Sequence, residues 1–129
     1  MPKFSIVIAA TAVLALTPSA YAQDGDAEAG AKVFRKCAAC HNVDNAKAKV
    51  GPSLQGVIGR QPGTVEGFKY SKAMVAFGEG KVWNAELLTE YLARPRDIVK
   101  GTRMAFAGLK KDDDIANVIA YISQFSPSE

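Results

Sequence analysis

The clearest hydrophobic periodicity of the chain lies near its two ends, where apolar residues recur three and four positions apart. Such spacing predicts a buried stripe along one face of an amphipathic helix. The first helix is expected from about Asp26 into the segment 37–41, and its stripe consists of Gly30, Val33, Phe34 and Cys37. The second is expected over about 112–124, with a stripe that consists of Ile115, Val118, Ile119 and Ile122.

Shorter helices are predicted between these ends. Ser71 is placed to cap a short one, and Asn84 to cap another that Pro95 ends. Residues 42–70 carry glycine or proline too often for a regular element, so they are expected to form a long loop. A second loop, bounded by glycines, is expected over 101–108. Because no strand pattern appears in the sequence, these elements predict an all-α fold of about four to five helices.

Cys37, Cys40 and His41 form a Cys-x-x-Cys-His motif at the end of the first predicted helix. At about 3.6 residues per turn they share one face, so two thiols reach one edge of a porphyrin while the imidazole faces its iron. The motif is typical of covalent c-type haem attachment. A thioredoxin-like redox pair or half of a zinc site would use the same cysteines. The first needs flanking strands and the second needs more ligands than two cysteines and one histidine provide.

A second axial ligand of a haem iron would be a histidine, a methionine or a lysine, or the position would stay empty. The chain has no second histidine, and beyond residues 1–22 its methionines are Met74 and Met104. Met74 lies in a short predicted helix, where methionine commonly fills an irregular core. Met104 lies in the glycine-bounded loop beside Phe106, and loops often carry ligands. The spacing therefore favours Met104 and leaves Met74 open. An iron with both axial positions filled has no site for a substrate, which favours a carrier over a catalyst.

Residues 1–22 have the features of a cleaved signal peptide. Lys3 provides a positive start, residues 4–16 are mostly apolar, and the segment 20–22 fits a small-x-small cleavage site. The apolar run is shorter than the about 20 residues that span a bilayer. The sequence therefore predicts export to the periplasm and one mature domain of residues 23–129, with a retained membrane anchor as the alternative.

The net charge of +3 is too small to indicate a nucleic-acid partner. Acidic residues gather at two predicted helix starts, around 24–28 and 112–114, whereas basic residues flank the haem motif and the second loop. A dipolar distribution of this kind would orient docking with an acidic partner. A set of merely solvated surface charges is the alternative.

From residue 23 onward the sequence resembles the class I cytochromes c, the family of mitochondrial cytochrome c and bacterial cytochrome c2, nearly end to end. The matching segments are CAACH at 37–41, GPSL at 51–54, GFKY at 67–70, Trp83, EYL at 90–92, GTRMAFAG at 101–108 and IAY at 119–121. The resemblance implies the cytochrome c fold, with helices wrapped around one covalently attached haem c. It also implies that the first helix crosses the last one where Gly30 meets Tyr121.

The resemblance implies roles for single residues as well. Met104 would be the distal iron ligand, and the carbonyl of Pro52 would accept the ring N–H of His41. Tyr91 would lie beside the Met104 sulfur, and Phe106 would shield the exposed haem edge. The haem propionates would be hydrogen-bonded by Arg60, Tyr70, Trp83 and Thr102.

A ring of basic residues around the haem edge is also implied, as the docking surface for electron donors and acceptors. It consists of Lys32, Lys36, Lys49, Arg96, Arg103 and Lys110. Two residues depart from the family pattern. Asp97 replaces a basic residue of the ring, and Met74 stands where the family often has an asparagine near the propionates.

The sequence thus predicts a monomeric periplasmic electron carrier, not an enzyme, that transfers one electron through an exposed haem edge and meets the membrane only through its partners. The resemblance implies a cytochrome bc1-type donor. The acceptor would be a terminal oxidase, a photosynthetic reaction centre or a periplasmic reductase. Two alternatives stay open: a haem-based ligand-binding or peroxidatic protein with a labile Met104, and a thiol oxidoreductase or zinc module without haem.

Overall fold

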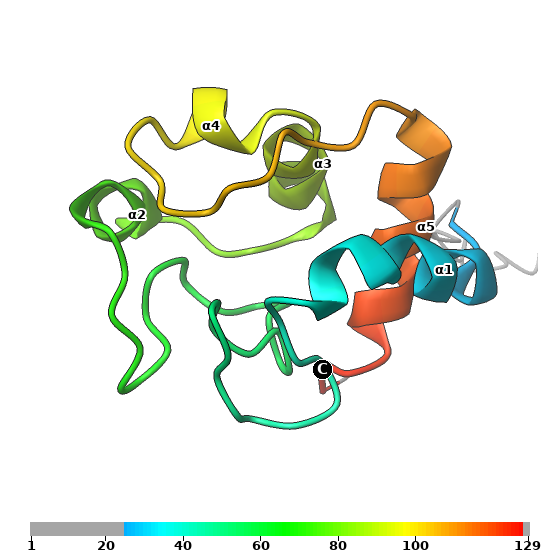
Figure 1. The fold of residues 1–129 in the computed structure, drawn as a ribbon, viewed down its shortest axis with the longest axis horizontal. Coiled ribbons are helices and arrows are strands. Elements are labelled where there is room, and N and C mark those ends of the chain that lie inside the picture. Colours follow the sequence, from blue (N-terminus) through cyan, green and yellow to red (C-terminus); the bar gives the residue numbers. More distant parts are fainter. Residues whose placement is uncertain (1–24, 128–129) are drawn as a thin grey trace, which may run out of the picture.

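The computed structural model describes residues 25–127, which form five helices, with long loops between α1 and α2 and between α4 and α5 (Figure 1). The helices are α1 (Ala27–Ala38), α2 (Lys72–Gly78), α3 (Ala85–Ala93), α4 (Pro95–Ile98) and α5 (Asp112–Ser123). None of the described residues forms a strand. The predicted all-α fold of four to five helices is therefore confirmed. The predicted signal peptide and its cleavage site lie outside the described residues.

Side-chain caps begin three of the helices where the sequence predicts them. An Asp26 carboxylate oxygen accepts the N–H of Glu28 at 2.8 Å, at the start of α1. Ser71 and Asn84 accept backbone N–H groups three residues further on, at 3.1 and 2.8 Å, and so begin α2 and α3. Each cap satisfies an N–H group that has no partner inside its helix.

The short helix α4 is not predicted by the sequence pattern. Pro95 was expected only to end the preceding helix, and α3 does end at Ala93. Pro95 is also the first residue of α4. Proline fits this position because its missing N–H would have no helical partner there and its backbone angle already suits a helix.

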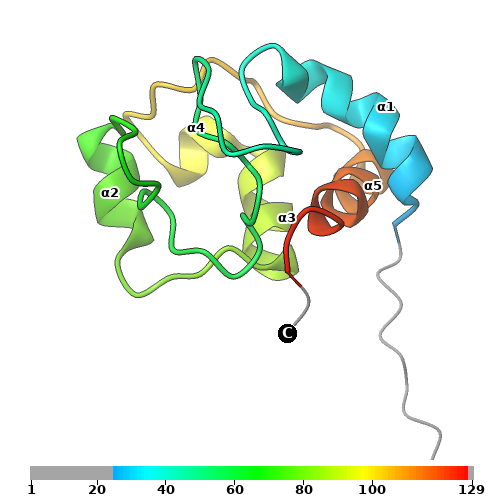
Figure 2. The ribbon, with the colours of Figure 1, turned by 90° about the horizontal axis from the view of Figure 1, so that it is seen from below.

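Helices α1 and α5 cross side by side in both ribbon views and make the most extensive contact of any helix pair (Figures 1 and 2). Gly30 lies at the crossing, where a Cβ atom would collide with the carbonyl of Asn117 and meet the Cβ of Tyr121. Phe34 packs its ring on that of Tyr121, with centroids 5.3 Å apart. The predicted crossing of the first and last helices at Gly30 is confirmed.

The remaining chain runs around a central region and does not close a compact helix bundle. The long loop between α1 and α2 and the loop between α4 and α5 face each other across the molecule (Figure 1). The buried core lies mainly on the α1, α3 and α5 side and includes Leu88, Ile115, Val118 and Ile122. Within residues 25–127, no helix has the length and apolar character needed to cross a membrane.

Candidate functional site

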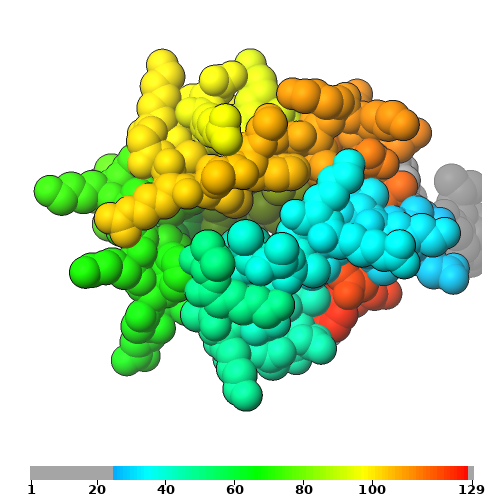
Figure 3. Space-filling model, viewed as in Figure 1, coloured from blue at the N-terminus to red at the C-terminus, as the bar shows by residue number. Residues whose placement is uncertain are grey.

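A cavity of about 510 Å³ lies between the two long loops, α2, α3 and the C-terminal end of α1. A hollow is visible in this region of the surface, between the segment around residues 100–106 and the loop below it (Figure 3). The volume falls within the range of about 300–1,000 Å³ that is usual for ligand pockets. All eleven residues to which the sequence assigns a role at the haem line this cavity: Cys37, Cys40, His41, Pro52, Arg60, Tyr70, Trp83, Tyr91, Thr102, Met104 and Phe106.

The Cys-x-x-Cys-His segment forms a tight turn at the end of α1. The backbone N–H groups of Cys40 and His41 both donate to the carbonyl of Cys37, at 3.1 and 2.9 Å. Burial raises the pKa of the Cys37 thiol. A thioredoxin-like redox pair needs the opposite shift, because its attacking thiol is activated by a lowered pKa.

His41 is held by the loop that follows it. Its Nδ1 donates a hydrogen bond to the carbonyl of Pro52 at 2.7 Å, because a carbonyl oxygen only accepts. Gly51 packs against the imidazole, and a Cβ atom there would collide with the ring. Burial lowers the pKa of His41, which favours the neutral ring. A neutral imidazole with its proton on Nδ1 keeps a free lone pair on Nε2, which is the form that ligates a metal.

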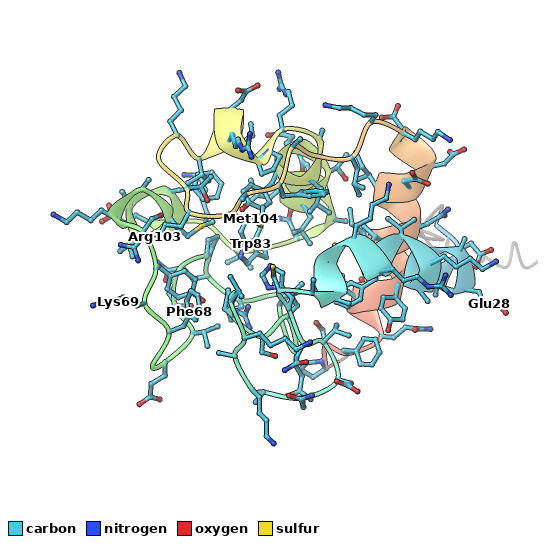
Figure 4. The ribbon with its side chains drawn as sticks, in the orientation of Figure 1. Glu28, Phe68, Lys69, Trp83, Arg103 and Met104 are labelled. Atoms are coloured by element: carbon cyan, nitrogen blue, oxygen red, sulfur yellow. The ribbon has the colours of Figure 1, made fainter. Side chains whose placement is uncertain are left out.

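Met104 is held in the loop after α4 by two polar contacts. Its backbone N–H donates to the Thr102 hydroxyl at 3.2 Å, and the Tyr91 hydroxyl donates to its sulfur at 3.9 Å. Burial raises the pKa of Tyr91 to about 12, so this hydroxyl keeps the proton that it donates. Met104 and the buried Trp83 both lie near the centre of the molecule (Figure 4). Met74 lines the same cavity from α2.

Arg60 and Tyr70 form a polar part of the cavity wall. The Arg60 guanidinium donates to the carbonyls of Ser53 and Gln55, at 3.0 and 3.2 Å. The Tyr70 hydroxyl accepts the backbone N–H of Val65 at 3.1 Å, which leaves its own proton available for another acceptor. Burial lowers the pKa of Arg60 and raises that of Tyr70, because both groups are partly withdrawn from water.

Several cavity-lining residues are absent from the site predicted by sequence. Phe68 lines the cavity and meets the ring of Tyr70 edge-on, with centroids 4.8 Å apart. The segment GFKY at 67–70 marks this region in the sequence, but the resemblance implies a role for Tyr70 alone. Ile122 was predicted as part of the buried stripe of α5, and it also reaches the cavity. A helical stripe does not reveal which of its residues face a ligand and which face another helix.

The dipolar distribution of charge and the basic docking ring stay predictions. Part of the ring lies close to acidic residues, since Lys32 shares α1 with Glu28 and Lys110 comes two residues before Asp112. All six residues of the predicted basic ring are exposed, and two of them, Lys36 and Arg103, also line the cavity. Lys69 and Arg103 lie at one end of the molecule and Glu28 at the other (Figure 4). The acidic first turns of α1 and α5 share that second end (Figure 1).

Comparison with known proteins places this arrangement in a family. A family model described as "Cytochrome c" matches residues 27–126. The chain is 50% identical over 106 residues to the cytochrome c2 of Afifella marina, which covers 80% of this chain and 86% of the relative. It is 49% identical over 102 residues to the cytochrome c-550 of Nitrobacter winogradskyi, with coverages of 78% and 92%. Cytochrome c type-1 of Ascaris suum is also 49% identical over 102 residues, with coverages of 78% and 89%.

Proposed function

This chain belongs to the cytochrome c family, and on that premise we propose that it is a periplasmic carrier whose single haem is ligated by His41 and Met104. Members of the family carry electrons and are not enzymes, and they hold haem c through a cysteine pair, here Cys37 and Cys40. The observation that carries the proposal is that residues far apart in the sequence, from Cys37 to Phe106, line one cavity. When bound, haem c supplies one-electron cycling between Fe(II) and Fe(III).

His41 is proposed as the proximal ligand. Its hydrogen bond to Pro52 and the close contact with Gly51 leave the imidazole little freedom to rotate. The same hydrogen bond raises the basicity of the ring and keeps the proton on Nδ1. These contacts therefore hold the His41 imidazole so that its Nε2 faces one fixed direction.

Met104 is proposed as the distal ligand in preference to Met74. The hydrogen bond from Tyr91 reaches the Met104 sulfur, and the Thr102 hydroxyl holds its backbone. A soft, neutral thioether stabilises ferrous over ferric iron and so raises the reduction potential, and burial acts in the same direction. Two filled axial positions leave no room for a substrate or a gas.

Four residues are proposed to hold the two propionates: Arg60, Tyr70, Trp83 and Thr102. A carboxylate withdrawn from water is costly unless donors surround it. Tyr70 acts as the acceptor in its hydrogen bond with the Val65 N–H, so it keeps a hydroxyl proton to donate. The guanidinium of Arg60 supplies positive charge at the same wall.

Electron exchange is proposed to take place through transient docking on the basic ring of Lys32, Lys36, Lys49, Arg96, Arg103 and Lys110. The proposed donor is a cytochrome bc1-type complex. The proposed acceptor is a terminal oxidase, a photosynthetic reaction centre or a periplasmic reductase. Residues 1–22 are proposed as a cleaved signal peptide, which leaves a monomeric domain of residues 23–129 in the periplasm.

Visible spectroscopy of the holoprotein tests the ligand assignment. We expect a low-spin c-type spectrum with the weak red band of methionine bound to ferric iron, and a mass that includes one haem. The Met104→Ala variant should lose this band and bind carbon monoxide readily in the ferrous state, whereas Met74→Ala should keep it. A high-spin spectrum of the unmodified protein would contradict the proposal and favour a ligand-binding or peroxidatic protein. A mass without haem would favour a thiol or zinc protein.

The docking proposal has its own test. The rate of electron transfer to a membrane preparation that contains a bc1 complex and an oxidase should fall as salt is raised, because screening shortens the reach of surface charges. Lys110→Ala should weaken this salt dependence. Lys81→Ala, which removes an exposed lysine outside the ring, should leave it unchanged. A rate independent of ionic strength would remove the electrostatic part of the proposal.

A further inference from the structure

Lys49 has a structural contact that its place in the proposed docking ring does not explain. Its Nζ donates a hydrogen bond to the carbonyl oxygen of Ala38 at 2.9 Å. Ala38 is the last residue of α1 and lies between Cys37 and Cys40. Among residues 25–127, no backbone N–H from outside α1 donates a hydrogen bond to the Ala38 carbonyl. Lys49 therefore satisfies one of the acceptors that a helix end otherwise leaves to water.

The Lys49 contact is one of a series that fastens the loop 49–54 to the segment 38–42. The other members are the bonds from Gly51 N–H to the Cys40 carbonyl, from Leu54 N–H to the Asn42 carbonyl and from His41 Nδ1 to the Pro52 carbonyl, at 2.8, 2.8 and 2.7 Å. The two segments are thus joined along most of their length. Lys49 makes the contact nearest to α1, and it alone brings a full charge to the series.

We propose that Lys49 is a positioning residue for the haem-attachment segment. Its ammonium group closes the C-terminal end of α1 and holds the turn that presents Cys40 and His41 to the cavity. A positive charge suits this place because the C-terminal end of a helix carries a partial negative charge. This role goes beyond docking, because it acts inside the molecule and needs no partner. One part rests on the proposed function, namely that the segment 37–41 holds haem.

Lys47 provides a matched control. It lies two residues before Lys49 in the same loop, is exposed, and carries the same charge. Within the described residues, its Nζ makes no hydrogen bond, and only its backbone is engaged, with the side chains of Asn42 and Asn45. Replacing either lysine by alanine removes one surface charge, but only Lys49→Ala removes the contact with α1.

Amide hydrogen exchange of the holoprotein tests the proposal. In Lys49→Ala the amides of Cys40, His41 and Gly51 should exchange roughly threefold faster, as expected for losing one exposed charge at a helix end. In Lys47→Ala their rates should not change, and amides in the middle of α5 should be unaffected in both variants. Lys49→Arg should restore the protection, since a guanidinium also donates to a carbonyl. The NMR shifts of the His41 ring in the reduced protein should move in Lys49→Ala only.

Equal exchange rates in the two alanine variants would overturn the proposal, and so would failure of Lys49→Arg to restore protection. If Lys49→Ala does not accumulate as holoprotein, Lys49→Gln replaces it. Glutamine is neutral and its side chain is shorter, so the same faster exchange of the three amides is expected. The mass of each variant reports separately on haem attachment. An unmodified protein without haem would refute the proposed function, while the same exchange comparison, made on the proteins without haem, would still decide whether Lys49 orders the turn.

Discussion

The helix pair α1–α5 and the loops that line the cavity are held together in different ways. In the helix pair, buried apolar side chains such as Phe34 and a close backbone approach at Gly30 leave little space. The cavity loops are fastened mainly by individual hydrogen bonds, and side chains such as Phe68 and Tyr70 stay partly exposed. Hydrophobic burial stabilises the first region by itself, whereas the second depends on polar contacts and on the group it encloses.

The largest expected effect is the loss of stability when a phenylalanine ring is removed from each of the two regions. Phe34→Ala should lower the free energy of unfolding by about 4 kcal/mol, because it removes a buried aromatic ring that packs on Tyr121. Phe68→Ala, the same change in a cavity loop, should cost roughly 1 kcal/mol, since its ring is only partly buried. Denaturant unfolding of the two holoproteins measures both values. Equal losses would contradict the division into two regions.

Glycine substitutions should distinguish the regions next. Gly30→Ala places a Cβ against the backbone of α5 and should cost about 2 kcal/mol, although alanine favours a helix. Gly67→Ala, in the long loop that lines the cavity, meets no neighbouring atom, and its cost of about 1 kcal/mol comes from the backbone angle φ of +78°. Thermal unfolding compares the two variants. A Gly30→Ala protein as stable as the original would mean that the crossing of α1 and α5 has room for a Cβ atom and is looser than this contact indicates.

Removal of a helix cap tests whether the loss of stability stays within one helix or reaches the whole domain. Asp26→Ala and Ser71→Ala each remove a cap worth about 1 kcal/mol, at α1 and α2. Because α1 belongs to the packed helix pair, Asp26→Ala should speed the slowest-exchanging amides about fivefold. Ser71→Ala should speed exchange in α2 and leave those slow amides unchanged. Hydrogen exchange followed by NMR reads both effects, and a global response to Ser71→Ala would show that α2 unfolds only with the whole domain.

The smallest effect concerns the pH dependence of stability in the cavity wall. Burial raises the pKa of Tyr70 above the value of about 10 that it has in an unfolded chain. The folded state therefore holds this proton more tightly, and the resulting stabilisation is complete below about pH 10 and lost as the pH rises through the folded pKa. The difference in unfolding free energy between the original protein and Tyr70→Phe should shrink from about pH 8 to about pH 11. A constant difference would mean that Tyr70 titrates normally.

Local patterns in the sequence were sufficient for most of the helical structure. The caps at Asp26, Ser71 and Asn84 depend on atoms within three residues, so the starts of α1, α2 and α3 follow from the sequence. The helix α4 does not follow from the sequence pattern. A proline that only ends a helix and a proline that also begins the next helix give the same pattern.

The candidate site divides in the same way. The Cys-x-x-Cys-His motif is contiguous, and one helical turn brings its three side chains to one face, so the sequence by itself determined the attachment point. It also determined the all-α class through its periodicity. Spacing alone favoured Met104 but left Met74 open, and the resemblance to a family added the further reason to prefer Met104.

Only the tertiary structure decided which distant groups meet. The contacts of Tyr91 with Met104 and of Lys49 with Ala38 join residues 13 and 11 positions apart through loops without periodicity. Phe68 and Ile122 became cavity residues in the same way, although neither has a local signal for that role. Helix periodicity and caps act within a few residues, whereas a cavity depends on how loops close over a distance, and no pattern of neighbouring residues encodes that closure.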